Sequence, residues 1–241
     1  YFQDVRGLDA QSSGLRLLPL IGGLAAGLAI GQRLQTPAKV PAGSPAGKPM
    51  VNAKVLVTIG FAVMAAALAI GAGTTVTSGT GFGATWFAVT GLGLGIAMPT
   101  ALNAALGALS PERSGSGSAL ITALRQVGGT IGVAVLGTII DSAYRSGLTA
   151  SGLPAAAANA ARGSVASGVA TARAVGSAPL LQAVRFSYVH GMDVMLWVCG
   201  GIALASALLG LAFLPRWARP PAPVTAPDAP ADAPRDVATA E

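Results

Sequence analysis

Long apolar stretches without charge alternate along this chain with short segments rich in charge, proline or glycine. No charged residue occurs between Lys54 and Glu112, a stretch too long for one membrane crossing of about 20 residues and suited to two. The segment GAGTTVTSGTGFG, residues 71–83, predicts the turn between those two crossings. The whole pattern predicts transmembrane helices near residues 15–33, 55–72, 84–108, 117–140 and 194–214.

The remaining segments are more polar and predict connections. Residues 1–14 are expected to be a lead-in on the extracellular side. Residues 142–191 are rich in Ala, Gly and Ser without a strong apolar face, which predicts an extracellular loop with at most weak surface helix. Residues 215–241 are rich in Pro and Ala and predict a disordered cytoplasmic tail. The expected fold class is therefore an all-α polytopic membrane bundle spanning residues 15–214.

The orientation follows from where the positive charges lie. The connection after the first predicted helix carries four basic residues and no acid, namely Arg33, Lys39, Lys48 and Lys54. The turn at 71–83 carries no charge. Because positive loops stay in the cytoplasm, the first connection is expected inside and the turn outside. The arginines of segment 142–191 would lie outside under this assignment, contrary to the preference of positive charges for the cytoplasm. Charges in long loops have little influence on orientation, so the assignment is kept.

Composition supports lipid as the main solvent of the chain. Hydrophobic residues make up 52% of it and charged residues only 10%, against roughly 25% charged in a soluble domain. The net charge is +6, but the basic residues are scattered and do not form a patch interleaved with aromatic residues. Nucleic-acid binding is therefore not expected. The composition instead predicts a multi-pass protein of the cell membrane, with the lipid bilayer as its partner.

Residues suited to enzyme chemistry are scarce. The single histidine, His190, lies near Asp193, and the single cysteine, Cys199, lies in an apolar run. Neither supplies a nucleophile with its base or a metal-ligand cluster. The segment GLGLGIA at 91–97 does not fit the dinucleotide fingerprint and has no strand before it, so it indicates helix packing. We therefore expect no enzyme activity, no cofactor and no metal.

Small residues repeat at helical spacing in two of the predicted helices. They are Gly23, Gly27 and Gly31 in the first helix and Gly91 and Gly95 in the third, where Pro99 follows. Such stripes let two helix backbones approach closely, and a proline can kink a helix. We expect these residues, together with Gly129 and Gly132 of the fourth predicted helix, to pack helices together or to serve as hinges.

The fourth predicted helix carries a charge on a face of small and polar residues. At 100° per residue this Arg125 face contains Ser118, Thr122, Arg125, Gly129 and Gly132. The opposite face contains Leu120, Leu124, Val127 and Ile131. Arg125 lies about 12 Å beyond Gly117 at 1.5 Å per residue, which is past the interface and short of the midplane. The pattern predicts that Arg125 points into the bundle.

A charge inside the membrane is costly and usually functional. Arg125 is therefore the first candidate for a residue that lines or gates a substrate or proton pathway, followed by Gln126, Asn103 and Thr122. Two other interpretations stand beside this one. Arg125 could extend along the helix to the cytoplasmic surface, or it could form a purely structural hydrogen bond between helices.

Several stretches together resemble the major facilitator superfamily. They are YFQDVRGLDAQSSGLRLLPL, GLGLGIAMPTALNAALGALSPERSGSGSALITALRQVGGTIGVAVLG and FSYVHGMDVMLWV. More closely, they resemble the C-terminal part of its fourteen-helix drug:proton antiporter branch (EmrB/QacA-like). The most specific features are the spaced glycines before Pro99, the sequence GSAL from Gly117, and RQ-x-GG from Arg125.

The resemblance implies that the five predicted helices are the last five of a major facilitator fold. The first nine helices, with the family's main proton-coupling acid, would then belong to the same polypeptide but lie outside this chain. The first connection, GQRLQTPAKVPAGSPAGKP, is longer and richer in proline than in many relatives. No acid lies within any of the five predicted spans, so proton transfer is not assigned to a residue here.

The resemblance also implies a function. The expected role is that of a C-terminal fragment of a bacterial secondary transporter that exports drugs or other small apolar or cationic compounds by proton antiport, through alternating access. Export of one endogenous metabolite or antibiotic is an alternative within the same family. A structural or assembly subunit of a membrane complex is an alternative from another class.

Overall fold

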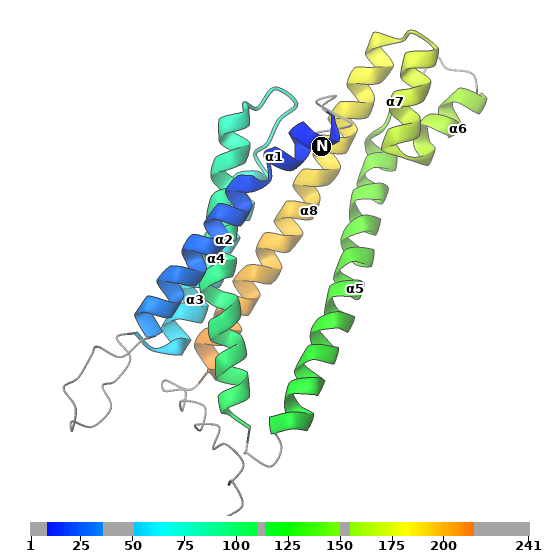
Figure 1. Cartoon of the computed structure of the whole chain (residues 1–241). Coiled ribbons are helices and arrows are strands. Elements are labelled where there is room, and N and C mark those ends of the chain that lie inside the picture. The colour runs from blue at the N-terminus through cyan, green and yellow to red at the C-terminus, as the bar shows by residue number, and fades with distance from the viewer. Residues whose placement is uncertain (1–8, 36–50, 110–113, 150–154, 215–241) are drawn as a thin grey trace, which may run out of the picture.

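The computed structural model describes residues 9–35, 51–109, 114–149 and 155–214, and every regular element in these ranges is an α-helix. The helices, drawn in Figure 1, are α1 (Ala10–Leu15), α2 (Leu18–Gln35), α3 (Ala53–Gly71), α4 (Thr80–Gly107), α5 (Ser114–Gly147), α6 (Ala155–Gly163), α7 (Val165–Ala174) and α8 (Ala178–Phe213). Within the described residues, five spans are long and apolar enough to cross a membrane: α1 with α2, then α3, α4, α5 and α8. The expected fold class, an all-α polytopic membrane bundle, is confirmed.

Helix bounds differ most from expectation within segment 142–191. α5 runs on to Gly147, and α8 begins at Ala178 instead of near 194. α6 and α7 lie between them, so the described part of this segment is mostly helical, where the sequence predicted a loop with at most weak surface helix. The small side chains that seemed too weakly apolar to hold a helix suffice here, because Ala161, Val169 and Ala172 are all buried in one cluster.

Two serine caps fix where these extra helices begin. The Ser164 hydroxyl accepts a hydrogen bond from the Ser167 backbone N–H at 3.1 Å, and the Ser167 hydroxyl accepts one from the Ser164 N–H at 2.9 Å. This reciprocal pair satisfies two backbone donors at the start of α7. At the start of α8, the Ser177 hydroxyl accepts from the Leu180 N–H at 3.3 Å.

The ends of the chain lie largely outside the described residues. The lead-in expected at 1–14 contributes only α1 to the structure. The first connection falls mainly on 36–50, and the tail expected at 215–241 is likewise outside the described ranges. α1 lies at the same end of the bundle as the turn between α3 and α4 (Figure 1).

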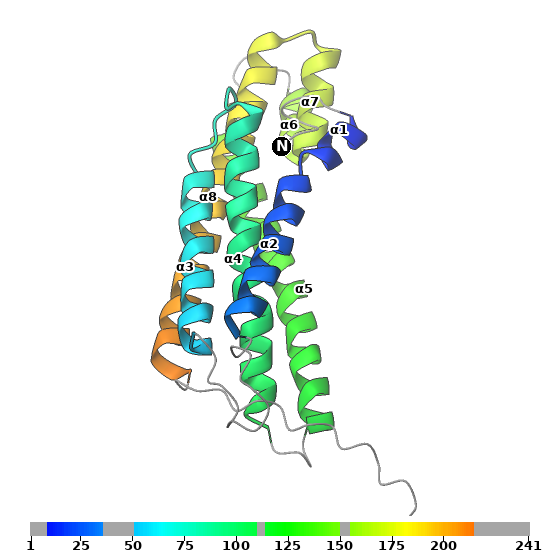
Figure 2. The ribbon, with the colours of Figure 1, turned by 60° about the vertical axis from the view of Figure 1, so that its left-hand side comes forward.

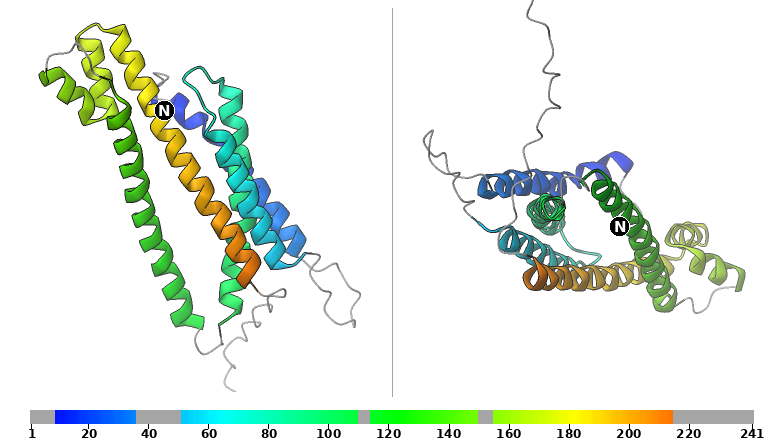
Figure 3. Two further views of the ribbon diagram at one scale, coloured as in Figure 1. Left: turned by 180° about the vertical axis from the view of Figure 1, so that it is seen from behind. Right: turned by 90° about the horizontal axis from the view of Figure 1, so that it is seen from below.

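Four of the membrane helices form a continuous packed layer. α4 lies between α2 and α3, and α8 packs against α3 (Figures 2 and 3). α5 contacts α8 near the Gly147 end, where Gly147 lies against Ser187 and Gly191 against the Ile140 carbonyl. From there α5 diverges from α8 toward the Ser114 end (Figure 3).

Glycines bring the α2 and α4 backbones into direct contact. A Cβ atom built on Gly23 would overlap the Ala88 carbonyl, and one built on Gly91 would overlap the Leu20 carbonyl. Gly27 and Gly95 lie against each other's backbones in the same way. Gly31 is looser, with its nearest α4 atom 3.6 Å from a built Cβ. The two glycine stripes therefore face each other across one helix interface.

The opposite face of α4 uses a second glycine contact, against α3. A Cβ on Gly93 would come within 2.6 Å of the Gly60 carbonyl, and a Cβ on Gly60 within 2.8 Å of the Gly93 carbonyl. Gly91 and Gly95 project about 200° around the helix from Gly93 at 100° per residue. The sequence GLGLGIA thus supplies bare backbone on two sides of α4, and this is how one helix packs closely between two others.

Candidate functional site

The Arg125 face of α5 has no protein cover within the described chain. Thr122, Arg125 and Gln126 are exposed, and a Cβ built on Gly129 or Gly132 would meet nothing within 4 Å. Among the described residues, Arg125 forms no hydrogen bond or ion pair. The opposite, aliphatic face is also bare, with Leu124 63% exposed. Lipid suits the aliphatic face, whereas the Arg125 face requires a polar partner.

Asn103 lies apart from the Arg125 face. It is an exposed residue of α4, four positions after Pro99. α4 and α5 make only a narrow contact, with Gly117 of α5 against the Leu109 side chain. The structure therefore does not join Asn103 to Arg125, Gln126 or Thr122 within the described chain.

A polar contact that the sequence reasoning missed lies beside Pro99. The Thr100 side chain is fully buried, and its hydroxyl donates to the Ile96 carbonyl at 2.8 Å. The Gln35 amide donates to the Thr100 hydroxyl at 2.9 Å and to the Gly31 carbonyl at 3.1 Å. This contact joins the last turn of α2 to α4 next to the residue that lacks a backbone N–H. In the sequence, this contact could have been suspected only from a threonine that directly follows a proline within a predicted helix.

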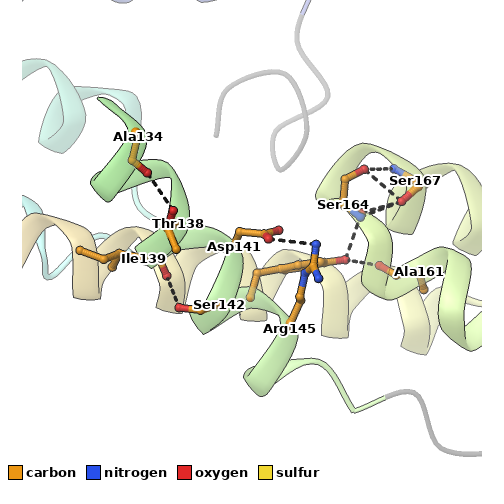
Figure 4. A network of polar contacts seen from close by, with 10 residues as sticks. Ala134, Thr138, Ile139, Asp141, Ser142, Arg145, Ala161, Ser164 and Ser167 are labelled. Atoms are coloured by element: carbon orange, nitrogen blue, oxygen red, sulfur yellow. Dashed lines mark hydrogen bonds and ion pairs between the residues drawn. The ribbon is translucent and has the colours of Figure 1, made fainter. Parts of the chain in front are cut away.

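The α5–α6–α7 corner, closed by the start of α8, contains a hydrophobic core of its own. It contains Tyr144, Leu148, Ala161, Val169, Ala172, Leu180 and Val184. Tyr144 is 1% exposed, and its hydroxyl donates to the Ala161 carbonyl at 2.8 Å. Figure 4 shows this corner, where Arg145 also pairs with Asp141 at 3.0 Å on the exposed side of α5. Because Asp141 and Arg145 are both exposed, their pair contributes little to stability.

Replacing Tyr144 with phenylalanine is expected to loosen this corner by about 1 kcal/mol, because the buried Ala161 carbonyl loses its donor. Amide hydrogen exchange across residues 155–174, followed by mass spectrometry, should become faster. Ser146→Ala is the matched control, since its exposed hydroxyl bonds only within α5. Equal exchange in both variants would contradict the assigned role of the Tyr144 hydroxyl.

A cavity of about 280 Å³ opens at the end of the bundle where α1 lies. We call it the α1-end cavity; it is lined by Arg16, Leu17, Thr74, Ser78, Gly79, Thr80, Gly83, Trp86, Phe87, Ile140, Tyr188, Met192, Met195 and Leu196. The Trp86 and Phe87 rings stack with their centroids 4.0 Å apart. This site draws residues from the α1–α2 junction, the turn between α3 and α4, and helices α4, α5 and α8, which is why the linear sequence gave no sign of it.

The comparison with known proteins points to transport. Over 64 residues, the chain is 42% identical to a probable actinorhodin transporter of Streptomyces coelicolor. The matched stretch is 27% of this chain and 11% of that transporter, so the chain spans a small part of the relative's length. No family model matches the chain. With its five apolar spans, the chain is a multi-pass membrane protein with partial similarity to a bacterial transporter.

Two acids lie within the membrane-crossing helices of this transporter-like chain, contrary to the expectation from the shorter predicted spans. Asp141 belongs to α5 and Asp193 to α8, because both helices extend beyond the bounds read from hydropathy. Asp193 has one buried carboxylate oxygen without a hydrogen-bond partner among the described residues. His190, one turn earlier, is exposed. The described residues hold no group of three His, Cys, Asp or Glu side chains that could bind a metal ion.

Proposed function

We propose that this chain forms the C-terminal part of a secondary active exporter of the major facilitator type, from the fourteen-helix drug:proton antiporter branch. The observation that carries the proposal is the 42% identity over 64 residues to a probable actinorhodin transporter. Five apolar helices and an arginine on a small-residue face support it. The exporter moves small apolar or cationic compounds outward across the cell membrane and protons inward, by alternating access.

In this proposal the Arg125 face borders the substrate or proton pathway. The remaining helices of the transporter, N-terminal to this chain in the same polypeptide, cover that face and supply the polar partner that Arg125 needs. The bare state of the face supports this arrangement, because an unpaired guanidinium facing lipid is costly. Gln126 and Thr122 share this part of α5, whereas Asn103 acts from α4 near Pro99.

The glycine contacts give the moving half a means to bend. α2 and α4 touch through backbone at Gly23, Gly27, Gly91 and Gly95. Pro99 interrupts the hydrogen bonding of α4 immediately after this contact. We assign the glycines to close packing and Pro99 to a hinge, with the cytoplasm on the side of residues 36–50 and the turn between α3 and α4 outside.

A second candidate is export of one endogenous antibiotic or metabolite. The description of the relative as an actinorhodin transporter favours this candidate over a broad drug exporter. The two candidates share the fold and mechanism and differ only in the breadth of substrates.

The test is export by the complete reading frame that contains this chain, expressed in bacterial cells loaded with a fluorescent cationic dye. Faster dye loss than in cells with the empty vector, slowed by a protonophore, is the expected result. Dye loss that the protonophore leaves unchanged would contradict proton coupling. Retention of all dyes tested, together with gradient-driven export of the host's own secreted aromatic compounds, would favour the second candidate.

A further inference from the structure

The α1-end cavity lies outside the pathway proposed for the Arg125 face and is built like a ligand site. Its volume of about 280 Å³ is close to the lower limit of small-molecule pockets, roughly 300–1,000 Å³. Its walls come from the junction of α1 and α2, the turn between α3 and α4, and three further helix segments. A pocket assembled from so many segments is held in shape by the bundle itself.

The apolar part of the wall suits a flat aromatic ring. Trp86 and Phe87 form a stacked pair on α4, and Met192 and Met195 line the cavity from α8. Aromatic faces stack on further rings, and thioether sulfurs make favourable contacts with them. Trp86 and Met192 also belong to the buried core that joins α3, α4 and α8, so this part of the wall is rigid.

The charge of the wall suits an anion. Arg16 is the single charged residue among the described residues that line the cavity, and it is half-buried. A guanidinium presents a planar fork of donors that matches a carboxylate. The hydroxyls of Thr74, Ser78 and Thr80 add polar atoms beside the turn.

We propose that the α1-end cavity binds a flat aromatic carboxylate, with its rings against Trp86, Phe87 and the two methionines and its carboxylate at Arg16. The site prefers anionic to neutral or cationic compounds of the same shape. This binding does not depend on the proposed transport function, because it is measured on the chain without a membrane gradient.

The first test compares anthracene-2-carboxylate with its neutral carboxamide, which has the same ring system. Isothermal titration calorimetry of the full chain in lipid nanodiscs, with empty nanodiscs subtracted, should give about tenfold tighter binding of the carboxylate. This comparison needs no variant. Equal affinity for the two probes would overturn the proposal.

Two pairs of variants locate the binding. Arg16→Gln should weaken carboxylate binding about tenfold and leave carboxamide binding unchanged. Arg33 is an exposed arginine near the far end of α2, and Arg33→Gln should change the binding of neither probe.

Gly83 lines the cavity and Gly81 does not, and a Cβ on either would meet nothing within 4 Å. Gly83→Leu should therefore block both probes, and Gly81→Leu neither. Identical affinities within either pair would overturn the proposed location.

Discussion

Replacing Gly23 with alanine is expected to lower the free energy of unfolding by about 3 kcal/mol, the upper range for an overpacked core. The added methyl group would overlap the Ala88 carbonyl, so α2 and α4 must separate along the whole interface. Neither helix backbone can yield locally, as a flexible side chain would. For a chain of this size, the melting temperature should fall by roughly 6–12 °C.

Gly22 is the matched control, one residue away on the same helix. A Cβ on Gly22 would meet nothing within 4 Å, and alanine favours helix over glycine by up to about 1 kcal/mol. Gly22→Ala should therefore keep or raise the melting temperature. Unfolding in detergent is conveniently followed by reaction of the lone, half-buried Cys199 with a fluorogenic maleimide. Equal melting temperatures for the two variants would refute the backbone contact between α2 and α4.

Replacing Arg125 with alanine is expected to reduce export by the complete transporter about tenfold or more, equivalent to at least about 1.4 kcal/mol of lost stabilisation along the transport cycle. In the proposed pathway role, the Arg125 guanidinium supplies both charge and fixed donors. Arg125→Lys should retain part of the export if charge alone matters, and little if the planar fork is required. Initial rates of dye or antibiotic efflux provide the measurement.

The controls separate a pathway role from the two structural interpretations. Arg173→Ala removes an exposed arginine on α7 and should export normally. Membrane abundance and melting temperature of the Arg125 variants should match the parent protein. Loss of export in step with loss of stability would show that Arg125 only braces the bundle. Normal export in both Arg125 variants would remove it from the mechanism.

Hydropathy predicted the number and order of the membrane helices because lipid requires about 20 consecutive apolar residues per crossing. The same criterion placed the start of α8 too late. The sequence before Val194 contains polar residues such as Arg185 and His190, which lower the local hydropathy. The helix nevertheless continues to Ala178, because Ser177 caps it and Leu180 and Val184 are buried against α5, α6 and α7. Hydropathy does not register such packing between helices.

The sequence could predict only those parts of the candidate site whose residues lie close together along the chain. A glycine repeated every fourth residue marks a face, but which helix lies on that face depends on tertiary packing. Gly60 was missed because it is solitary, and its partner is recognisable only once α3 lies beside α4. The α1-end cavity joins Arg16 to Met195 across most of the chain, which no local pattern indicates. The role of Arg125 stays a prediction, since its face is bare in the described chain.

The glycine contacts on both sides of α4 also affect the entropy of assembly. When two helices pack through long side chains, each buried side chain loses up to about 2 kcal/mol of rotamer freedom. Glycine has no side chain to immobilise, so α2, α3 and α4 associate at Gly23, Gly60, Gly91 and Gly93 without that loss. At these four positions the helices therefore come together without a long side chain having to settle into one rotamer.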